Sequence, residues 1–123
     1  MSAEGSAMET HHLVLPEDLN QYGFLFGGRL LRWVDEASWI AASLEYPACR
    51  FVTLAMDKVE FRHSVREGTI LSIRSEQCSK GFSSVTYEVS VRRGKVADGE
   101  PIFSTRVTFV NVDQAGGKVE IGE

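Results

Sequence analysis

The sequence predicts an α+β fold in which one long central helix is wrapped by a curled antiparallel sheet of about five strands. Only one segment, from Phe26 to Tyr46, has the length and apolar spacing of a helix. The segments after residue 50 alternate apolar and polar residues, as half-buried strands do. Short stretches of turn-forming residues separate these segments, which favours antiparallel neighbours.

The N-terminal part is expected to hold a tail, a short strand and the helix. Residues 1–9 are small and polar and are predicted to form a disordered tail, so that residues 10–123 form a single domain. A strand is predicted at 11–15, where Pro16 stops it, and 17–23 is a loop rich in turn formers. Pro47 ends the helix.

The remaining strands follow in sequence with short connections. Strands are predicted at 51–65, 70–79, 84–93 and 102–112. In the third of these, Val85 and Tyr87 alternate with Thr86 and Glu88. Turns are predicted at 66–69 and 80–83, a hairpin loop at 94–101, and a tail or short edge strand after residue 112.

The helix is unusually apolar for a surface helix. At about 100° per residue, its apolar side chains fill roughly 200° of the circumference. We therefore expect a curled sheet or a partner subunit to cover it on most sides. Asp35 falls about 20° beyond Ala42, at the boundary of this face. A carboxylate at this boundary is partly desolvated but still accessible.

Composition narrows the function classes. The net charge of −4 and the pI of about 5.4 give no overall electrostatic attraction to nucleic acid. Residues 1–12 lack the pattern of a secretory leader, and no apolar run approaches the roughly 18 residues of a membrane span, so a cytoplasmic location is expected. The two cysteines, Cys49 and Cys78, and the three histidines match no metal-ligand spacing, and no metal site is predicted.

Three segments carry a resemblance to a known family. NQYGFLFGGRLLRWVDEA resembles the pattern of hotdog-fold acyl-CoA thioesterases, specifically the broad-range bacterial and cytosolic long-chain acyl-CoA hydrolases. RFVTLAMDKVEFRHSVREGTIL and KGFSSVTYEVSV resemble two further segments of that family, in the same order. The resemblance covers about residues 11 to 113. The chain departs from the family pattern at Phe82 and at His63-Ser64. In the first segment the matching residues are Asn20, Gly23, Phe26, Gly27, Gly28, Val34 and Asp35.

The resemblance implies hydrolysis of the thioester of acyl-CoA to a free fatty acid and coenzyme A, which is part of the substrate and not a separate cofactor. The first N–H groups of a helix lack internal acceptors, so Gly27 and Gly28 are candidates for polarising the carbonyl. Asp35 is the candidate general base or nucleophile. Asn20 is the candidate for orienting water or thioester, and Thr53 for placing a hydroxyl near Asp35.

The resemblance also implies an assembly. Gly27 and Asp35 are separated by about 12 Å of helix rise, too far for one reacting group within one chain. In the family, the carboxylate of one protomer meets the glycine amide of the other. A homodimer that assembles into a tetramer or a hexamer is therefore expected, with acyl-CoA as the small-molecule partner. The residues expected to contact coenzyme A are Arg62, His63, Lys80, Gly81, Ser83 and Ser84.

Structural roles stay open for the same residues. The glycines could serve close packing, Asp35 could pair with Arg32, and Asn20 could serve a turn.

Two other functions remain as alternatives to thioester hydrolysis. A hotdog hydratase or dehydratase would carry a His just before the helix, where YGFLFGG has none. A non-catalytic acyl-CoA-binding module would have no use for a half-buried Asp35. The acyl chain is expected to run along the helix, beside Trp33 or Trp39.

Overall fold

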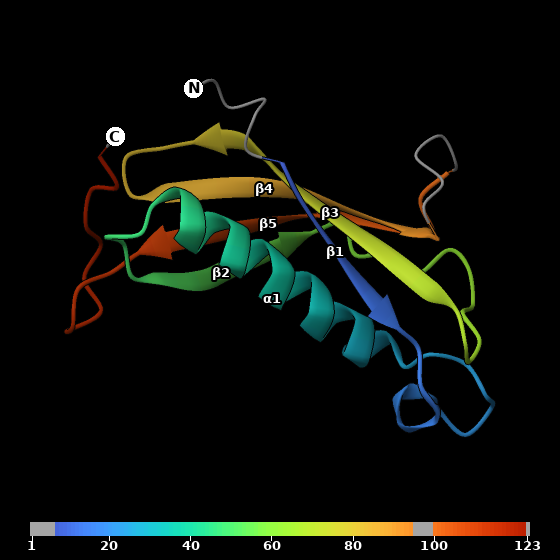
Figure 1. The fold of residues 1–123 in the computed structure, drawn as a ribbon. Helices are drawn as coiled ribbons and strands as arrows, with labels where there is room; N and C mark the ends of the chain where they lie inside the picture. Colours follow the sequence, from blue (N-terminus) through green and yellow to red (C-terminus); the bar gives the residue numbers. More distant parts are fainter. Residues whose placement is uncertain (1–6, 95–99, 123) are drawn as a thin grey trace.

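The computed structural model describes residues 7–94 and 100–122 and shows one long helix lying across one face of a five-stranded antiparallel sheet (Figure 1). The strand order in the sheet is β1-β3-β4-β5-β2, so β1 and β2 are its two edges. The predicted α+β architecture is confirmed. The elements are β1 (Met8–Leu13), a 3-10 turn η2 (Pro16–Asp18), α1 (Gly27–Glu45), β2 (Phe51–Asp57), β3 (Ile70–Lys80), β4 (Ser84–Arg93) and β5 (Phe103–Asn111).

Helix α1 has the bounds that the sequence predicts, within one residue at each end. Phe26 is the N-cap in an extended conformation, and Tyr46 is the C-cap directly before Pro47. The start of the helix is anchored to η2. The Arg29 Nε atom lies 3.3 Å from Oδ1 of the buried Asp18, whose Oδ2 accepts a 2.8 Å hydrogen bond from the Leu15 N–H. This ion pair fixes the direction in which α1 leaves the N-terminal loop.

The core lies between α1 and the inner face of the sheet. Side chains pointing inward from the three central strands are fully buried, among them Ile73, Tyr87 and Phe109. Helix residues such as Val34 and Ala42 close the other side. The outer face of the same strands is polar, as the pair Glu88 and Arg106 of β4 and β5 illustrates. The alternation predicted for 84–93 is therefore the alternation of core and outer face.

Two strand predictions need correction. β1 begins at Met8, so Met8 and Glu9 belong to the sheet and not to the tail expected at 1–9; residues 1–6 lie outside the described part of the chain. β1 ends at Leu13, because Val14 instead bonds through its N–H and its carbonyl to the turn at 68–69. β2 ends at Asp57 and not at 65, because Lys58 adopts a φ of 60° and turns the chain out of the sheet.

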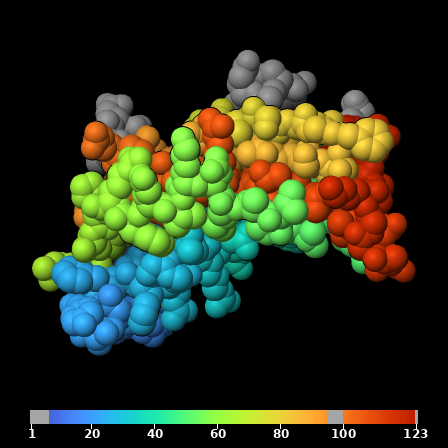
Figure 2. Space-filling view, turned by 180° about the vertical axis from the view of Figure 1, so that it is seen from behind, coloured from blue at the N-terminus to red at the C-terminus, as the bar shows by residue number. Residues whose placement is uncertain are grey.

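The segment that leaves β2 lies on the surface. Figure 2 shows it in light green, between the blue N-terminal region and the orange-to-red β5. The predicted hairpin loop at 94–101 falls mostly outside the described residues. Within residues 112–122, Val112 and Lys118 form one isolated bridge, and no further strand is added to the sheet.

The sheet covers less of α1 than the apolar face requires. Trp33 and Ala41 are buried, but Trp39 is 42% exposed and Leu44 is 70% exposed. The helix was expected to be covered by a curled sheet or by a partner subunit, and the sheet of one chain is therefore not sufficient by itself. Within the described residues, no helix has the length and apolar character needed to cross a lipid bilayer.

Candidate active site

Asp35 lies on the flank of α1 that faces the edge strand β2. Its Oδ1 accepts a 2.7 Å hydrogen bond from the Thr53 hydroxyl, so the predicted proximity of these two residues is confirmed. Thr53 pairs with Phe109 in the sheet register, which places its side chain on the inner, helix-facing side. No described residue donates to Asp35 Oδ2, and no ion pair with Arg32 is present among them. The carboxylate is half-buried, held at one oxygen and open at the other.

Gly27 and Gly28 at the helix start have different surroundings. A Cβ on Gly27 would lie 2.9 Å from the ring of Phe61, so Gly27 permits a close approach of that ring. A Cβ on Gly28 would meet nothing within 4 Å. Neither glycine N–H has an acceptor in the described residues, because the helical bonds begin at Arg29. The packing role thus applies to Gly27, whereas Gly28 presents an open N–H donor at the positive end of the helix dipole.

Asn20 is fixed in the turn that precedes the helix. Its Oδ1 accepts hydrogen bonds from the N–H groups of Tyr22 (2.9 Å) and Phe24 (3.1 Å). The turn role left open by the sequence is therefore observed. These two bonds also fix the amide plane, and Asn20 Nδ2 makes no hydrogen bond to a described residue. An oriented amide donor remains available.

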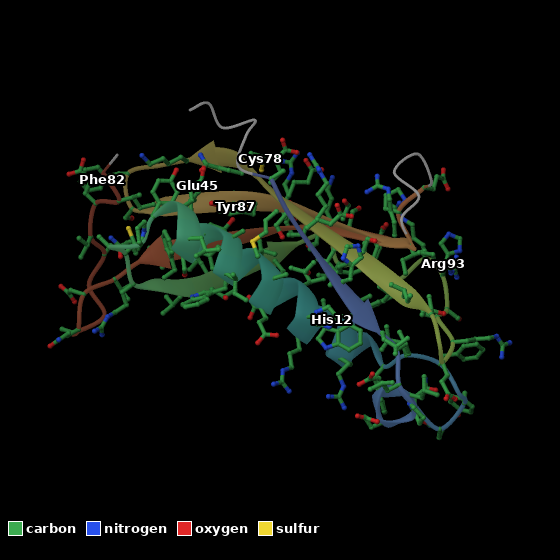
Figure 3. The ribbon with its side chains drawn as sticks, viewed as in Figure 1. His12, Glu45, Cys78, Phe82, Tyr87 and Arg93 are labelled. Atoms are coloured by element: carbon green, nitrogen blue, oxygen red, sulfur yellow. The ribbon has the colours of Figure 1, made fainter. Side chains whose placement is uncertain are left out.

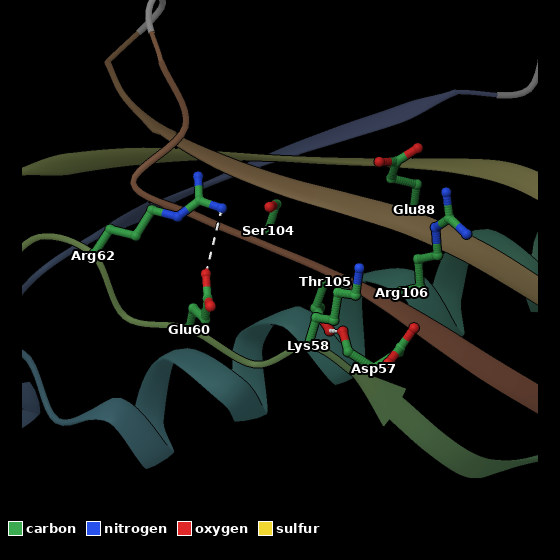
Figure 4. A pocket seen from close by; sticks show the side chains of 8 residues that line it. All are labelled: Asp57, Lys58, Glu60, Arg62, Glu88, Ser104, Thr105 and Arg106. Atoms are coloured by element: carbon green, nitrogen blue, oxygen red, sulfur yellow. Dashed lines mark hydrogen bonds and ion pairs between the residues drawn. The ribbon is translucent and has the colours of Figure 1, made fainter.

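His63 and Arg62 are neighbours in sequence but line different hollows. His63 lies beside the helix start in an apolar hollow that also includes Phe26, Gly27 and Phe61. Arg62 lines a charged hollow at the other face of the sheet, with Lys58, Glu88 and Arg106 (Figure 4). Arg62 forms an ion pair with Glu60 there, at 3.5 Å. The structure therefore separates these two predicted coenzyme A contacts.

The hairpin residues Lys80, Gly81, Ser83 and Ser84 lie at the far end of the molecule. Phe82 marks this tip in Figure 3, next to the C-terminal end of α1. Lys80 lies over the Tyr46 ring at 5.4 Å and donates to the Gly122 carbonyl, while the Gly81 N–H donates to Ser84 O at 2.8 Å. Tyr46 comes eleven residues after Asp35, about 16 Å along the helix. One chain does not bring the hairpin and Asp35 together.

Two features of the site had no clear sequence signal. The Trp39 Nε1–H donates to the Phe51 carbonyl at 3.0 Å, which fixes this exposed indole beside β2. The Asp18–Arg29 ion pair joins residues eleven positions apart in an irregular loop and a helix. Helical spacing from Asp35 to Trp39 shows that both share one flank, but it does not reveal which strand they meet.

The opposite flank of α1 is closed by an aromatic stack. His12 of β1 lies on Trp33 with ring centroids 4.5 Å apart (Figure 3). Burial lowers the pKa of His12, although Glu36 and Asp18 oppose this shift. At the C-terminal end of the helix, burial and a hydrogen bond to Glu45 raise the pKa of Tyr87.

Among residues 7–94 and 100–122, no group of three His, Cys, Asp or Glu side chains is placed to hold a metal ion, and neither cysteine forms a disulfide.

Solved structures share this architecture over nearly the whole chain. The acyl-CoA hydrolase from Staphylococcus aureus, solved in complex with butyryl coenzyme A and coenzyme A, superposes with a TM-score of 0.82 and is 27% identical; the match covers 98% of this chain and 71% of that one. The hexameric thioesterase of Yersinia pestis gives a TM-score of 0.83 at 29% identity, with 93% of both chains covered. The fold is therefore the hotdog fold of acyl-CoA hydrolases.

The sequence comparison agrees with the structural one. The model of the thioesterase superfamily matches residues 22–100, and this chain belongs to that family. The human cytosolic acyl coenzyme A thioester hydrolase is 27% identical over 114 residues, which are 89% of this chain. The match spans only 30% of the length of that human protein. The Staphylococcus aureus enzyme has also been solved as three variants, in which one asparagine, one aspartate or one threonine is replaced by alanine.

Proposed function

We propose that this chain hydrolyses the thioester of acyl-CoA to a free carboxylic acid and coenzyme A. The observation that carries the proposal is the Asp35–Thr53 pair. A half-buried carboxylate is oriented by a 2.7 Å hydrogen bond and keeps its second oxygen open on the uncovered flank of the helix. In a chain of the thioesterase superfamily, such a carboxylate is suited to act on water or directly on a carbonyl carbon.

Each proposed role uses a group that is free in the structure. Asp35 accepts the proton of a water molecule whose oxygen attacks the thioester carbonyl, or attacks that carbon itself through an anhydride. The Gly28 N–H stabilises the developing negative charge on the carbonyl oxygen, and the Asn20 Nδ2 donates to the water or the thioester. On the water route, the carbon–sulfur bond then breaks, and the coenzyme A thiolate takes up the proton that Asp35 accepted. On the anhydride route, this bond breaks as the anhydride forms; water then hydrolyses the anhydride, which releases the acid, restores the Asp35 carboxylate and supplies the proton of the thiol.

Residue spacing supports these assignments. In the Staphylococcus aureus enzyme, the substituted asparagine and aspartate are fifteen residues apart, which is the separation of Asn20 and Asp35 here. Its substituted threonine follows the aspartate by seventeen residues, and Thr53 follows Asp35 by eighteen. The same three residue types therefore recur in the same order and at nearly the same spacing.

We infer that the complete site needs a second copy of the chain. Gly28 lies two helical turns from Asp35, about 10 Å of rise, so one chain does not present both to one carbonyl. Strand β2 is an edge of the sheet, and its Val52 and Leu54 are exposed. An edge with free backbone groups and apolar side chains is suited to pair with a copy of itself. Pairing about a two-fold axis would also bring the distant Lys80–Ser84 hairpin of one chain toward the other chain's site.

The proposal is tested with a panel of acyl-CoAs of increasing chain length and a reagent that detects released thiol. Wild-type protein should release coenzyme A from at least one of them and should be a dimer or a multiple of a dimer by light scattering. The Asp35→Ala variant should fold and lose at least about a hundredfold in kcat. Glu36→Ala, which removes the next carboxylate on the exposed side, is the matched control and should retain wild-type kcat.

Two results would contradict the proposal. Absence of thiol release with every chain length, with tight acyl-CoA binding retained, would identify a binding module instead of an enzyme. Near-wild-type turnover by Asp35→Ala would assign Asp35 a structural role only.

A further inference from the structure

Trp39 occupies a distinctive position relative to Asp35. It follows Asp35 by four residues, so the two side chains lie on the same flank of α1, about 6 Å apart along the helix axis. Both contact strand β2: Thr53 bonds to Asp35, and the Phe51 carbonyl accepts the indole N–H of Trp39 at 3.0 Å. The carboxylate and the indole therefore belong to one continuous surface between the helix and the edge strand.

The indole is exposed but held in place. It is 42% exposed, the largest aromatic side chain on the uncovered part of α1, and its hydrogen bond ties the ring to the backbone of β2. The other tryptophan of the helix, Trp33, is buried against His12 and belongs to the core. Of the two tryptophans beside which an acyl chain could run, the structure leaves only Trp39 accessible next to Asp35.

The surface around Asp35 is also polarised along the helix. Arg32, one turn before Asp35, is exposed and charged, whereas Trp39, one turn after it, is apolar. A thioester bound at Asp35 would therefore place its polar coenzyme A part toward the start of the helix and its acyl part toward Trp39.

We propose that Trp39 is the wall that ends the acyl subsite and restricts this enzyme to short acyl chains. This inference rests on the proposed thioesterase function. The anchored indole stands one helical turn beyond the reacting carbonyl and leaves room for only a few methylene groups before the chain meets the ring. The occupant is the acyl chain of the substrate, because the apolar surface is continuous with Asp35. Trp39 acts on specificity and not on the chemical step.

The test compares kcat/KM for acetyl-, butyryl-, octanoyl- and palmitoyl-CoA in wild-type protein and in Trp39→Ala. Wild type should prefer the two short substrates. Trp39→Ala should raise the ratio of octanoyl-CoA to butyryl-CoA efficiency by at least about tenfold, within the range that pocket contacts provide. Trp39→Phe keeps a ring without the indole N–H, and its octanoyl-to-butyryl efficiency ratio should lie between those of wild type and Trp39→Ala. This variant tests the inference if the alanine variant is unstable.

Leu44→Ala is the matched control. Leu44 is also an exposed apolar residue of α1, but it follows Trp39 by five residues and so lies about 140° away around the helix. Leu44→Ala should leave the chain-length profile unchanged. A wild-type preference for palmitoyl-CoA would overturn the inference, and so would an unchanged profile in both Trp39 variants. Dissociation of the Trp39→Ala oligomer with an unchanged profile would show that the indole serves only subunit contact. No thiol release by wild type from any substrate would instead contradict the proposed function itself.

Discussion

Two tryptophans of helix α1 lie on opposite flanks of the helix and have different surroundings. Trp33 faces edge strand β1, where it is 9% exposed and stacks on His12. Trp39 faces edge strand β2, where it is 42% exposed and is held by a single hydrogen bond to a backbone carbonyl. The helix thus packs against edge strand β1 through buried rings, whereas it contacts edge strand β2 through polar groups, and this second side stays accessible.

This difference indicates where structure and function reside in the molecule. Apolar packing on the β1 side, where the rings of His12 and Trp33 stack, contributes to stability. On the β2 side, Asp35 and Trp39 each use one polar atom to contact the strand and keep part of the side chain open. The proposed catalytic and specificity residues both lie on this second side.

The largest expected effect is a difference in the free energy of unfolding that is lost when the tryptophan on each flank is replaced. Trp33→Ala should lower the free energy of unfolding by about 3–5 kcal/mol, because it removes a large buried side chain. The same substitution at Trp39 should cost about 1–2 kcal/mol, since that side chain is already partly in water. Urea unfolding followed by circular dichroism, at equal protein concentration, measures both. Equal losses would show that the β2 side is as structural as the β1 side.

A smaller effect is expected at the polar contact itself. Thr53→Val keeps the shape of the side chain but removes the hydroxyl that orients Asp35, and should lower kcat about tenfold, or ~1.4 kcal/mol in the barrier. Thr53→Ser should restore most of this activity. Thr86→Val is the matched control, because it removes a 2.9 Å hydroxyl contact with Thr108 on the outer face of the sheet. Wild-type kcat in Thr53→Val would mean that the hydroxyl does not position the carboxylate.

The smallest effect concerns pH and the β1 side. Burial against Trp33 lowers the pKa of His12 below its usual value of 6.5, so the folded protein holds the neutral ring. Below about pH 6.5 the unfolded chain binds this proton more readily, and stability should fall as the pH decreases toward the lowered pKa. Above that window His12 contributes no pH dependence.

Replacement of His12 tests this assignment. His12→Phe keeps an aromatic ring on Trp33 and should lose part of the acid destabilisation that wild type shows between about pH 7 and pH 5. His11→Phe alters the neighbouring exposed histidine and should leave the wild-type dependence in place. Melting temperatures across this range measure the difference, and the same acid sensitivity in wild type and His12→Phe would refute the role of His12.

Parts of the candidate site were predictable because they depend on local geometry. The boundary position of Asp35 follows from its angle on the helix, and the free N–H groups follow from the helix start at Gly27. The proximity of Thr53 to Asp35 was also expected and is observed. The distinction between Gly27 and Gly28 was not predictable, because it depends on Phe61, which reaches the helix start from a segment thirty-odd residues away.

The sequence by itself determined the elements whose signals are local. Helix α1 and strand β4 match their predicted bounds closely, since caps, prolines and apolar periodicity act between residues a few positions apart. Only the tertiary structure decided which flank of the helix stays open. That choice depends on the strand order β1-β3-β4-β5-β2, which places β2 at an edge beside Asp35 and Trp39. Strand order is set by long-range pairing, and no local pattern in residues 26–46 contains it.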